Sequence, residues 1–596
     1  MKEACNVYKD MQYQEAMKQN DKEEWIKGVK EEFKNLVNLE SFEEVILPKN
    51  RKAIETRWVM HRKTDGRYRP RLVVKGFQQI AGVDFTNSYA PVAGYNIFRL
   101  VLTLAAELDL EVETYDSSTA FAQNKLDEEV YIEIPDGYDE YCLKKIKNVK
   151  KIGRKVLLLK KAMNGLIQGA YNQYRNVEKQ MLKEGFKVDT KTPGLFVKWI
   201  SGKVIVVAVW VDDFLIVFSK KIEKETREFI QRITEILLLR KTSGKLLGME
   251  LNITDDAFYL SSESYIENKV TELNPGILSD KGKFIATPLP HKEDIEPEEK
   301  YDERLLTEYQ QVVGSLIHAS NSLRFDVTYS VGVLSRMVTK VDKKLLTYAY
   351  RVLDYLYTTK NYRLIFKRNI NRDKKRESTL KCESATERTL QYDINRDDIG
   401  NRHTIDIIHQ IDKELTEMVE ELKEEKYEPQ EKESYKPQLQ AYVDADFAGD
   451  RETRRSTTGF IICVANTPVY WRSKLQSTVA TRTAEAEIIA LYELSQELLY
   501  YTHVMNNLGI HQKTIEVYED NQAAIAIMTR PEKQTKMRHL DTKYFKIQEL
   551  ISEKTINVNY VKSANNVSDL MTKALPTATH KGLLKHLGLW HHQVKA

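Results

Sequence analysis

The stretch Val204-Ile-Val-Val-Ala-Val-Trp-Val-Asp-Asp-Phe-Leu-Ile-Val-Phe218 decides the fold, because it is an apolar run interrupted at its centre by two carboxylates, Asp212 and Asp213. β-Branched and aromatic residues on both sides favour strands, and the acids favour a turn between them. The stretch therefore predicts a β-hairpin with both acids at its tip. Both strands are apolar at nearly every position, as in a hairpin covered on both faces. The carboxylates then lie at the edge of a dry core and need cations.

A third carboxylate is predicted to join the two at the hairpin tip. Residues 110–116 alternate with a period of two, which places Leu110, Val112, Thr114 and Asp116 on one face of a strand. Three carboxylates at strand ends of one sheet can hold two Mg²⁺ ions for in-line phosphoryl transfer, which is polymerase chemistry. Acids at a hairpin tip are also ordinary turn residues. The pattern alone leaves both interpretations open.

Several short motifs, in order along the chain, resemble the reverse transcriptase of copia-class LTR retrotransposons. They are Arg57-Trp-Val, Arg71-Leu-Val-Val-Lys-Gly-Phe77, Tyr89-Ala-Pro-Val92, Asp116-Ser-Ser-Thr-Ala-Phe121, Lys161-Ala-Met-Asn-Gly-Leu-Ile-Gln168, Trp210-Val-Asp-Asp213 and Leu247-Gly-Met-Glu-Leu251. The resemblance implies a right-hand polymerase that copies RNA and DNA templates. It also implies that Asp116, Asp212 and Asp213 are its catalytic, metal-binding residues.

The same resemblance implies four residues around the incoming deoxynucleotide. Arg71 and Lys75 match cations for the triphosphate, Phe121 matches an aromatic residue that excludes a ribose 2′-hydroxyl, and Gln168 matches a glutamine beside the nucleotide. Each residue also has a structural interpretation, because charged positions on a two-stranded ribbon are usually exposed and Phe121 fits a core position equally well. Residues 169–171 (Gly-Ala-Tyr) replace the family's Ala-Pro-Arg, which removes a cation.

The residue pattern of the C-terminal region predicts a second β-sheet. Three hairpin-linked strands at 439–446, 458–464 and 468–471 precede a long helix over about 484–507. Strands and helices then alternate to the end of the chain. This order predicts an α/β layer fold.

Four acids of this region occupy the ends of four different elements. Asp444 ends the first strand, Glu485 lies in the first turn of the long helix, Asp520 follows the fourth strand and Asp569 lies on the last helix. Together they can hold a pair of Mg²⁺ ions for phosphodiester hydrolysis, although each alone fits an ordinary helix-start residue.

The motifs around these acids resemble the copia-class ribonuclease H. They are Asp444-Ala-Asp-Phe-Ala-Gly-Asp450, Ser456-Thr-Thr-Gly459, Ala484-Glu-Ala-Glu487, Glu519-Asp-Asn-Gln522, Arg538-His-Leu-Asp541 and Ser568-Asp-Leu-Met-Thr-Lys573. The resemblance implies cleavage of the RNA strand in RNA–DNA hybrids, with Asp444, Glu485, Asp520 and Asp569 as catalytic metal ligands.

The predicted fold class is a multidomain protein with α/β and α+β parts, a polymerase with fingers, palm and thumb followed by a ribonuclease H-like mixed α/β domain. The expected divisions are 1–50, an N-terminal helical extension; 51–290, fingers and palm; 291–367, thumb and connection; 368–437, a charged linker or insertion; and 438–596, the ribonuclease H-like domain. An amphipathic helix should follow Asp21, which has capping-box spacing from Glu24. The linker contains a candidate helix at 406–426 and should let the last domain move.

The composition of the chain limits the classes of protein to which it can belong. The chain has 596 residues, of which 42% are hydrophobic and 30% charged, as in several soluble domains. Its formal net charge of +4 is too small to argue for a nucleic-acid partner. The four cysteines have neither zinc nor disulfide spacing. No apolar run is long enough for a membrane span, so we expect an intracellular protein without membrane contact.

The resemblance implies cofactors and partners that composition does not. It implies two Mg²⁺ ions in each active site, with Mn²⁺ as a substitute. The implied partners are an RNA template, a DNA primer, an RNA–DNA hybrid and deoxynucleoside triphosphates. It also implies a cytoplasmic location in a virus-like particle, or a nuclear one, and leaves a homodimer open.

Two other interpretations stay open at this point. A degraded retroelement remnant, acting at most as a nucleic-acid-binding protein, would fit the altered triplet after Gln168 and the charged insertion. A structural protein that binds calcium is favoured less, because the acids do not have the spacing of a calcium loop. Retention of all seven predicted catalytic acids favours the enzyme.

Overall fold

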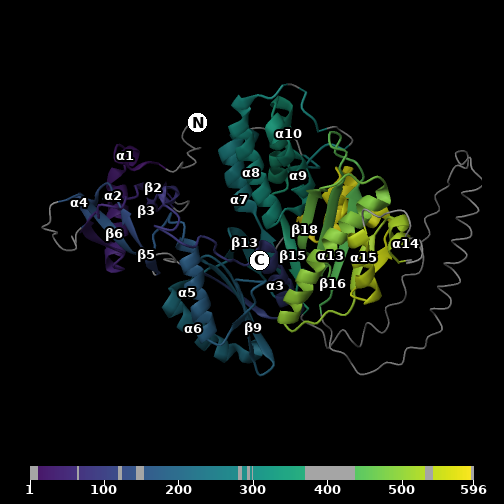
Figure 1. Cartoon of the computed structure of the whole chain (residues 1–596), viewed down its shortest axis with the longest axis horizontal. Coiled ribbons are helices and arrows are strands. Elements are labelled where there is room, and N and C mark those ends of the chain that lie inside the picture. The colour runs from purple at the N-terminus through teal and green to yellow at the C-terminus, as the bar shows by residue number, and fades with distance from the viewer. Residues whose placement is uncertain are drawn as a thin grey trace, which may run out of the picture. The chain divides into compact units, whose positions relative to one another are not determined.

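The computed structural model describes residues 11–62, 66–117, 124–142, 153–278, 285–291, 295–298, 300–369, 437–529 and 541–591. Phe121, the candidate helix at 406–426 and nearly all of the charged linker lie outside the described residues. Met1–Asn369 and Pro437–Ala596 belong to one compact unit (Figure 1). No helix in the described ranges is long and apolar enough to cross a membrane.

The predicted hairpin forms the centre of a six-stranded sheet. Its strands are β9 (Lys203–Trp210) and β10 (Asp213–Phe218), and the strand predicted to carry Asp116 is β4 (Glu111–Ser117), which pairs with β10. The order is β11-β4-β10-β9-β8-β7, and the outer strands are β11 (Leu239–Lys241), β8 (Leu195–Ile200) and β7 (Lys187–Val188).

Helices cover this sheet on both faces, as the apolar hairpin predicted. Val206, Ala208 and Leu215 pack in one hydrophobic cluster with α3 (Tyr95–Glu107). Alternate residues such as Val207 pack in another cluster with α5 (Gly169–Lys183) and α6 (Glu223–Leu237). The sheet is therefore dry on both sides.

A separate core forms in the N-terminal part of the chain. The elements are α1 (Tyr13–Ala16), α2 (Lys22–Asn38), β1 (Phe42–Ile46), β2 (Thr56–Arg62), β3 (Tyr68–Val74), β5 (Lys125–Ile132), α4 (Tyr138–Tyr141) and β6 (Lys155–Lys161). The strands form a β2-β3 ribbon and a β1-β6-β5 sheet. The predicted amphipathic helix is α2, which buries Trp25 and Phe33. Asp21 does not cap it by a side-chain bond, because its carboxylate accepts the Tyr68 hydroxyl at 2.7 Å instead.

The middle of the chain is mainly helical, as predicted. It contains β12 (Lys245–Leu246), β13 (Met249–Ile253), β14 (Ala257–Ser261), α7 (Glu263–Leu273), α8 (Leu306–Ser322), α9 (Thr328–Arg336), α10 (Lys343–Thr358) and β15 (Tyr362–Lys367). The strands belong to a sheet of order β12-β13-β14-β15-β21, whose last strand, β21 (Leu589–His591), comes from the C-terminal end.

The C-terminal region has the predicted α/β layer fold. Its elements are β16 (Leu439–Asp446), β17 (Thr457–Val464), β18 (Thr467–Leu475), α13 (Thr483–Asn507), β19 (Ile515–Glu519), α14 (Gln522–Thr529), α15 (Asp541–Ser552), β20 (Ile556–Tyr560), α16 (Asp569–Thr572) and α17 (Thr577–His586). The sheet order is β18-β17-β16-β19-β20, antiparallel over the first three strands and parallel over the last three. Figure 1 shows α13 and α15 lying along this sheet.

The C-terminal sheet shares a hydrophobic core with α3, which contradicts the expected free movement of the last domain. The Arg99 guanidinium of α3 donates to the Val469 carbonyl of β18 at 2.9 Å and lies 3.8 Å from the centroid of the Trp471 ring. β21 continues the same connection by pairing with β15. Residues on both sides of 370–436 are thus packed together directly, because apolar surface of α3 and β18 is buried between them.

Candidate catalytic sites

The hairpin brings its two acids next to the third, as predicted. Asp213 and Asp116 are direct neighbours in the antiparallel pairing of β10 and β4. The turn at the tip requires a positive φ of 55° at Val211, and the Ser117 amide donates to the Asp212 carbonyl at 2.9 Å. The oxygens of these three carboxylates are not all within 4.8 Å of one another.

Burial dominates the electrostatics of this hairpin tip. It raises the pKa of Asp213 to about 7, and the charges of Asp212 and Asp116 act in the same direction. It also raises the pKa of Asp212, where the charge of Asp116 adds to the effect and Arg71 opposes it. The acids are therefore close enough to disfavour one another's ionised form, which is the condition that a divalent cation relieves.

Two neighbouring segments hold the hairpin tip in place. The Leu247 amide donates to the Asp213 carboxylate from the turn between β12 and β13, where Leu247 and Gly248 both have positive φ. Trp210 packs against Tyr95 of α3, with ring centroids 5.1 Å apart. The motif Leu247-Gly-Met-Glu-Leu251 therefore helps to position the Asp213 carboxylate, because it supplies a backbone donor.

The predicted nucleotide-binding residues occupy different surroundings. Arg71 is exposed on β3, and its charge reaches Asp212. Lys75 forms an ion pair with Glu55. Gln168 is 2% exposed and precedes the first residue of α5, and its side chain accepts from Gln79 at 2.9 Å and donates to the Asp84 carbonyl at 2.8 Å. Both ends of that amide are thus used inside the protein.

The C-terminal acids gather more tightly. Carboxylate oxygens of Asp444, Asp520 and Asp569 all lie within 4.8 Å of one another. Asp569 is the first residue of α16, which approaches β17 at Gly459, where a Cβ would lie 2.4 Å from the Thr572 side chain. The Asn566 amide also donates to the Val443 carbonyl at 2.9 Å. The close approach at Gly459 and the hydrogen bond of Asn566 therefore position Asp569 beside Asp444.

Glu485 does not join these acids, and its prediction is corrected to Glu487. The Glu485 carboxylate accepts the amide and hydroxyl of Thr481, each at 2.7 Å, in the first turn of α13. Glu487 instead lies within 4.8 Å of Glu519 and Asp520. Residues two apart on a helix point about 200° away from one another, so only one of the two can face the sheet. The motif Ala484-Glu-Ala-Glu487 contained both candidates, and the geometry of the carboxylates favours Glu487.

Sequence reasoning also missed Lys573. Its ammonium lies 2.7 Å from Asp569 and 3.7 Å from Asp444. Burial alone would lower the pKa of Lys573, but the charges of Asp444 and Asp569 raise it instead. Burial and the charge of Asp444 raise the pKa of Asp569 to about 7. The signal was present, because Lys573 follows Asp569 by four residues and so returns to the same side of a helical turn.

Glu519 is a second missed acid. Ile515, Val517 and Glu519 alternate along β19 and are all buried, so the carboxylate faces the core in phase with two apolar side chains. The same argument correctly placed Asp116 on β4. A period-two analysis of residues 515–519 would have found it.

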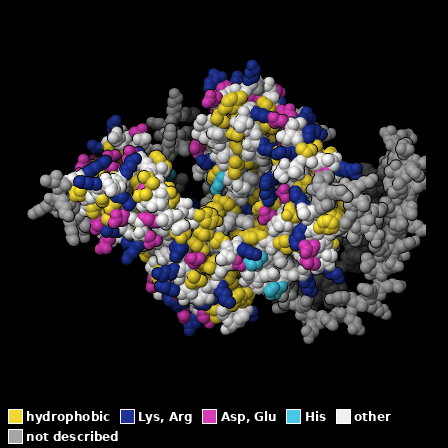
Figure 2. Space-filling model, in the orientation of Figure 1, with side chains coloured by type: hydrophobic (Ala, Val, Ile, Leu, Met, Phe, Trp, Pro, Cys, Tyr) yellow, Lys and Arg dark blue, Asp and Glu magenta, His cyan; other side chains and the backbone are white. Residues whose placement is uncertain are grey.

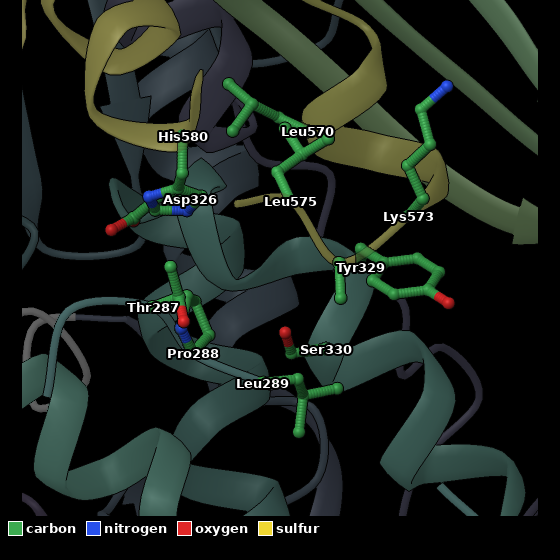
Figure 3. Close-up of a pocket in the computed structure, with 11 residues that line it drawn as sticks. Thr287, Pro288, Leu289, Asp326, Tyr329, Ser330, Leu570, Lys573, Leu575 and His580 are labelled. Atoms are coloured by element: carbon green, nitrogen blue, oxygen red, sulfur yellow. The ribbon is translucent and has the colours of Figure 1, made fainter. Parts of the chain in front are cut away.

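A small cavity lies behind α16 and contributes no further acid to the site. Figure 3 shows His580 beside Asp326, with the Lys573 side chain directed away from the cavity. Asp326 is held by Arg324 through two hydrogen bonds of 2.9 and 2.6 Å, and both side chains are fully buried. This ion pair lies between α8 and α9 in the chain and stabilises the region that packs against α16.

Comparisons with known proteins find similar sequences over most of the chain. Residues 39–283 match the family described as reverse transcriptase (RNA-dependent DNA polymerase). The chain is 28% identical over 577 residues to the retrovirus-related Pol polyprotein from transposon TNT 1-94 of Nicotiana tabacum, covering 94% of this chain and 37% of that protein. It is 24% identical over 554 residues to that from transposon RE1 of Arabidopsis thaliana, covering 91% and 32%. Over most of its length the chain is thus similar to Pol polyproteins of copia-class retrotransposons.

A yeast relative and two solved structures extend the comparison. The Transposon Ty1-DR5 Gag-Pol polyprotein of Saccharomyces cerevisiae is 21% identical over 597 residues, covering 96% of this chain and 29% of that protein. The chain thus spans about a third of the length of these relatives. A foamy viral protease-reverse transcriptase in complex with dsDNA has a TM-score of 0.39 at 12% identity, covering 90% of this chain and 83% of that one. The ribonuclease LC11-RNase H1 from compost has 0.19 at 16%, covering 23% and 92%.

Proposed function

We propose that this chain is an RNA- and DNA-directed DNA polymerase with ribonuclease H activity on RNA–DNA hybrids. The observation that carries the proposal is the pair of acid clusters on two separate sheets, one at the β9–β10 hairpin and one around Asp444. The first lies inside residues 39–283, which match the reverse transcriptase family, and the second lies beyond them. Two carboxylate sites on one chain suit two phosphoryl-transfer reactions.

The donor set at each site fits Mg²⁺, which prefers carboxylate oxygens. In the polymerase site Asp116, Asp212 and Asp213 would hold the ions, and in the ribonuclease H site Asp444, Glu487, Asp520 and Asp569 would do so. Ions held there activate an attacking oxygen and stabilise the leaving oxygen. The Leu247 amide fixes the orientation of Asp213. Lys573 balances part of the negative charge of Asp444 and Asp569.

Exposed aromatic side chains in the segment that bonds to Gln168 support contact with nucleic acid. Phe77 is 83% exposed and Tyr89 is 76% exposed. Both flank Gln79 and Asp84, which bond to Gln168. Bases stack readily on such rings. In the face shown in Figure 2, basic and acidic side chains are intermixed, so the charges on that face do not by themselves indicate a nucleic-acid partner.

Cleavage of a labelled RNA–DNA hybrid with Mg²⁺ tests the proposal most directly. The full chain should cut the RNA strand, and Asp444→Asn should abolish the cut while leaving hybrid binding intact. Primer extension on an RNA template, lost in Asp212→Asn, tests the other site. A folded chain that binds hybrid but gives no product in either assay would overturn the proposal in favour of a nucleic-acid-binding remnant.

A further inference from the structure

The ribonuclease H cluster contains one carboxylate more than the four acids that the proposed function uses. Oxygens of Glu487, Glu519 and Asp520 lie within 4.8 Å of one another, and Asp520 also belongs to the set with Asp444 and Asp569. Two sets of three carboxylates therefore share one member. This is a suitable arrangement for two neighbouring cations.

Two atoms of the second set have no hydrogen-bond donor. Glu487 is 5% exposed and Glu519 is fully buried, and one oxygen of each accepts no hydrogen bond. The other oxygen of Glu519 accepts the Asn521 amide at 2.9 Å. Among the described residues, neither Glu487 nor Glu519 forms an ion pair, whereas Lys573 pairs with Asp569. A buried carboxylate that has an oxygen without a donor and no ion-pair partner is unfavourable, and a bound metal ion resolves that condition.

Resting on the proposed function, we propose that Glu519 is a metal ligand and that Glu487, Glu519 and Asp520 bind one divalent cation before any nucleic acid is present. Three oxygen ligands in fixed positions suit Mg²⁺ or Mn²⁺. The ligands come from α13, from the end of β19 and from the residue after it, so the position is built into the fold. Water molecules can complete the octahedral coordination of an ion held by three carboxylate oxygens, so binding does not need a substrate phosphate.

Mn²⁺ binding to the nucleic-acid-free full chain, followed by electron paramagnetic resonance of the free ion, tests this proposal. The wild type should bind an ion that Glu519→Gln loses or binds at least about tenfold more weakly. Glu516→Gln is the matched control, because Glu516 lies on β19 but bonds to the Asn557 side chain. It should bind Mn²⁺ like the wild type. Unchanged Mn²⁺ binding in Glu519→Gln would overturn the proposal.

Thermal unfolding supplies a second readout, because the Tm should respond differently if Glu519 has only a structural role. In EDTA, Glu519→Gln should raise the Tm, because it removes repulsion from Glu487, and added Mn²⁺ should raise the Tm less than in the wild type. A lower Tm in EDTA with a full response to Mn²⁺ would contradict ligation. If Glu519→Gln does not fold, Glu487→Gln should lose the same ion, and normal Mn²⁺ binding in that variant would overturn the proposal.

Hybrid cleavage distinguishes failure of this inference from failure of the proposed function. A wild type that cleaves hybrid, beside a Glu519→Gln variant with normal Mn²⁺ binding, overturns only the assignment of Glu519. A Glu519-dependent Mn²⁺ site in a chain without cleavage supports the assignment and counts against the ribonuclease H activity.

Discussion

Replacing Arg99 with methionine should loosen the contact between α3 and the C-terminal sheet. The guanidinium donates to the carbonyls of Val469, Asn321 and Ser322 at 2.9, 2.9 and 2.6 Å, and it is nearly inaccessible to solvent. No carboxylate in the described part of the chain pairs with it. Burial lowers the pKa of Arg99 to about 9, so it stays charged at neutral pH. Methionine keeps the length of the apolar stem and removes only the donors.

The size of the effect depends on the carbonyls that lose their donor. Leaving one buried acceptor unsatisfied costs about 1–3 kcal/mol, so three set an upper bound of about 9 kcal/mol. Removing a buried charge offsets part of that loss, because its desolvation is relieved. We therefore expect a net destabilisation of the α3–β18 contact of about 3–5 kcal/mol, roughly half of that upper bound.

Hydrogen exchange measured by mass spectrometry is a suitable assay, because it reports each region separately. In Arg99→Met, amides of α3 and β18 should exchange roughly 100-fold or more faster, while those of the β2–β3 ribbon keep their protection. Arg175→Met, at an exposed position of α5, is the matched control and should change neither. Unchanged protection of α3 and β18 in Arg99→Met would refute the argument that Arg99 joins the two regions.

Three further predictions address single side chains. Glu487→Gln should slow hybrid cleavage by at least ~100-fold, which is more than the loss of a residue that only orients a ligand. Glu485→Gln should cleave hybrid at a rate within a few fold of the wild type. The reverse order of rates in a cleavage assay would favour Glu485, the residue chosen from the sequence. The pKa of Asp213 is raised to about 7 from 3.8, so the folded metal-free chain holds a proton that the unfolded chain releases. Urea unfolding in EDTA should therefore show stability falling as the pH rises from about 4 to 7, and Asp213→Asn should flatten that part of the profile. Asp326→Asn leaves buried Arg324 unpaired and should cost about 3–5 kcal/mol of stability, and an unchanged urea midpoint would contradict this.

The sequence predicted those site features that depend on local pattern. The period of two placed Asp116 on the strand next to the hairpin, where the structure pairs it with Asp213. The apolar run at 204–218 predicted a sheet covered on both faces, and the order of strands and helices predicted the C-terminal layer fold. These features arise from side-chain alternation and burial alone.

The sequence could not decide features that depend on which atoms meet in space. Glu485 and Glu487 both lie near the start of one helix, and only the direction of each side chain relative to β19 separates a capping carboxylate from one in the acid cluster. Gln168 precedes the first residue of α5, and its bonds to Gln79 and Asp84 come from a segment more than eighty residues earlier. No local pattern encodes such contacts.

Apolar packing of α3 against β18 explains why the C-terminal sheet does not have the free movement that the sequence predicted. By its composition, the charged and weakly apolar segment 370–436 offers little apolar surface to bury. The regions on either side do have such surface, and α3 presents apolar residues both to its own sheet and to β18. Arg99 then adds three donors at that contact. The position of the ribonuclease H-like sheet is therefore a property of α3 rather than of the linker, and substitutions in α3 should affect it more than changes in linker length.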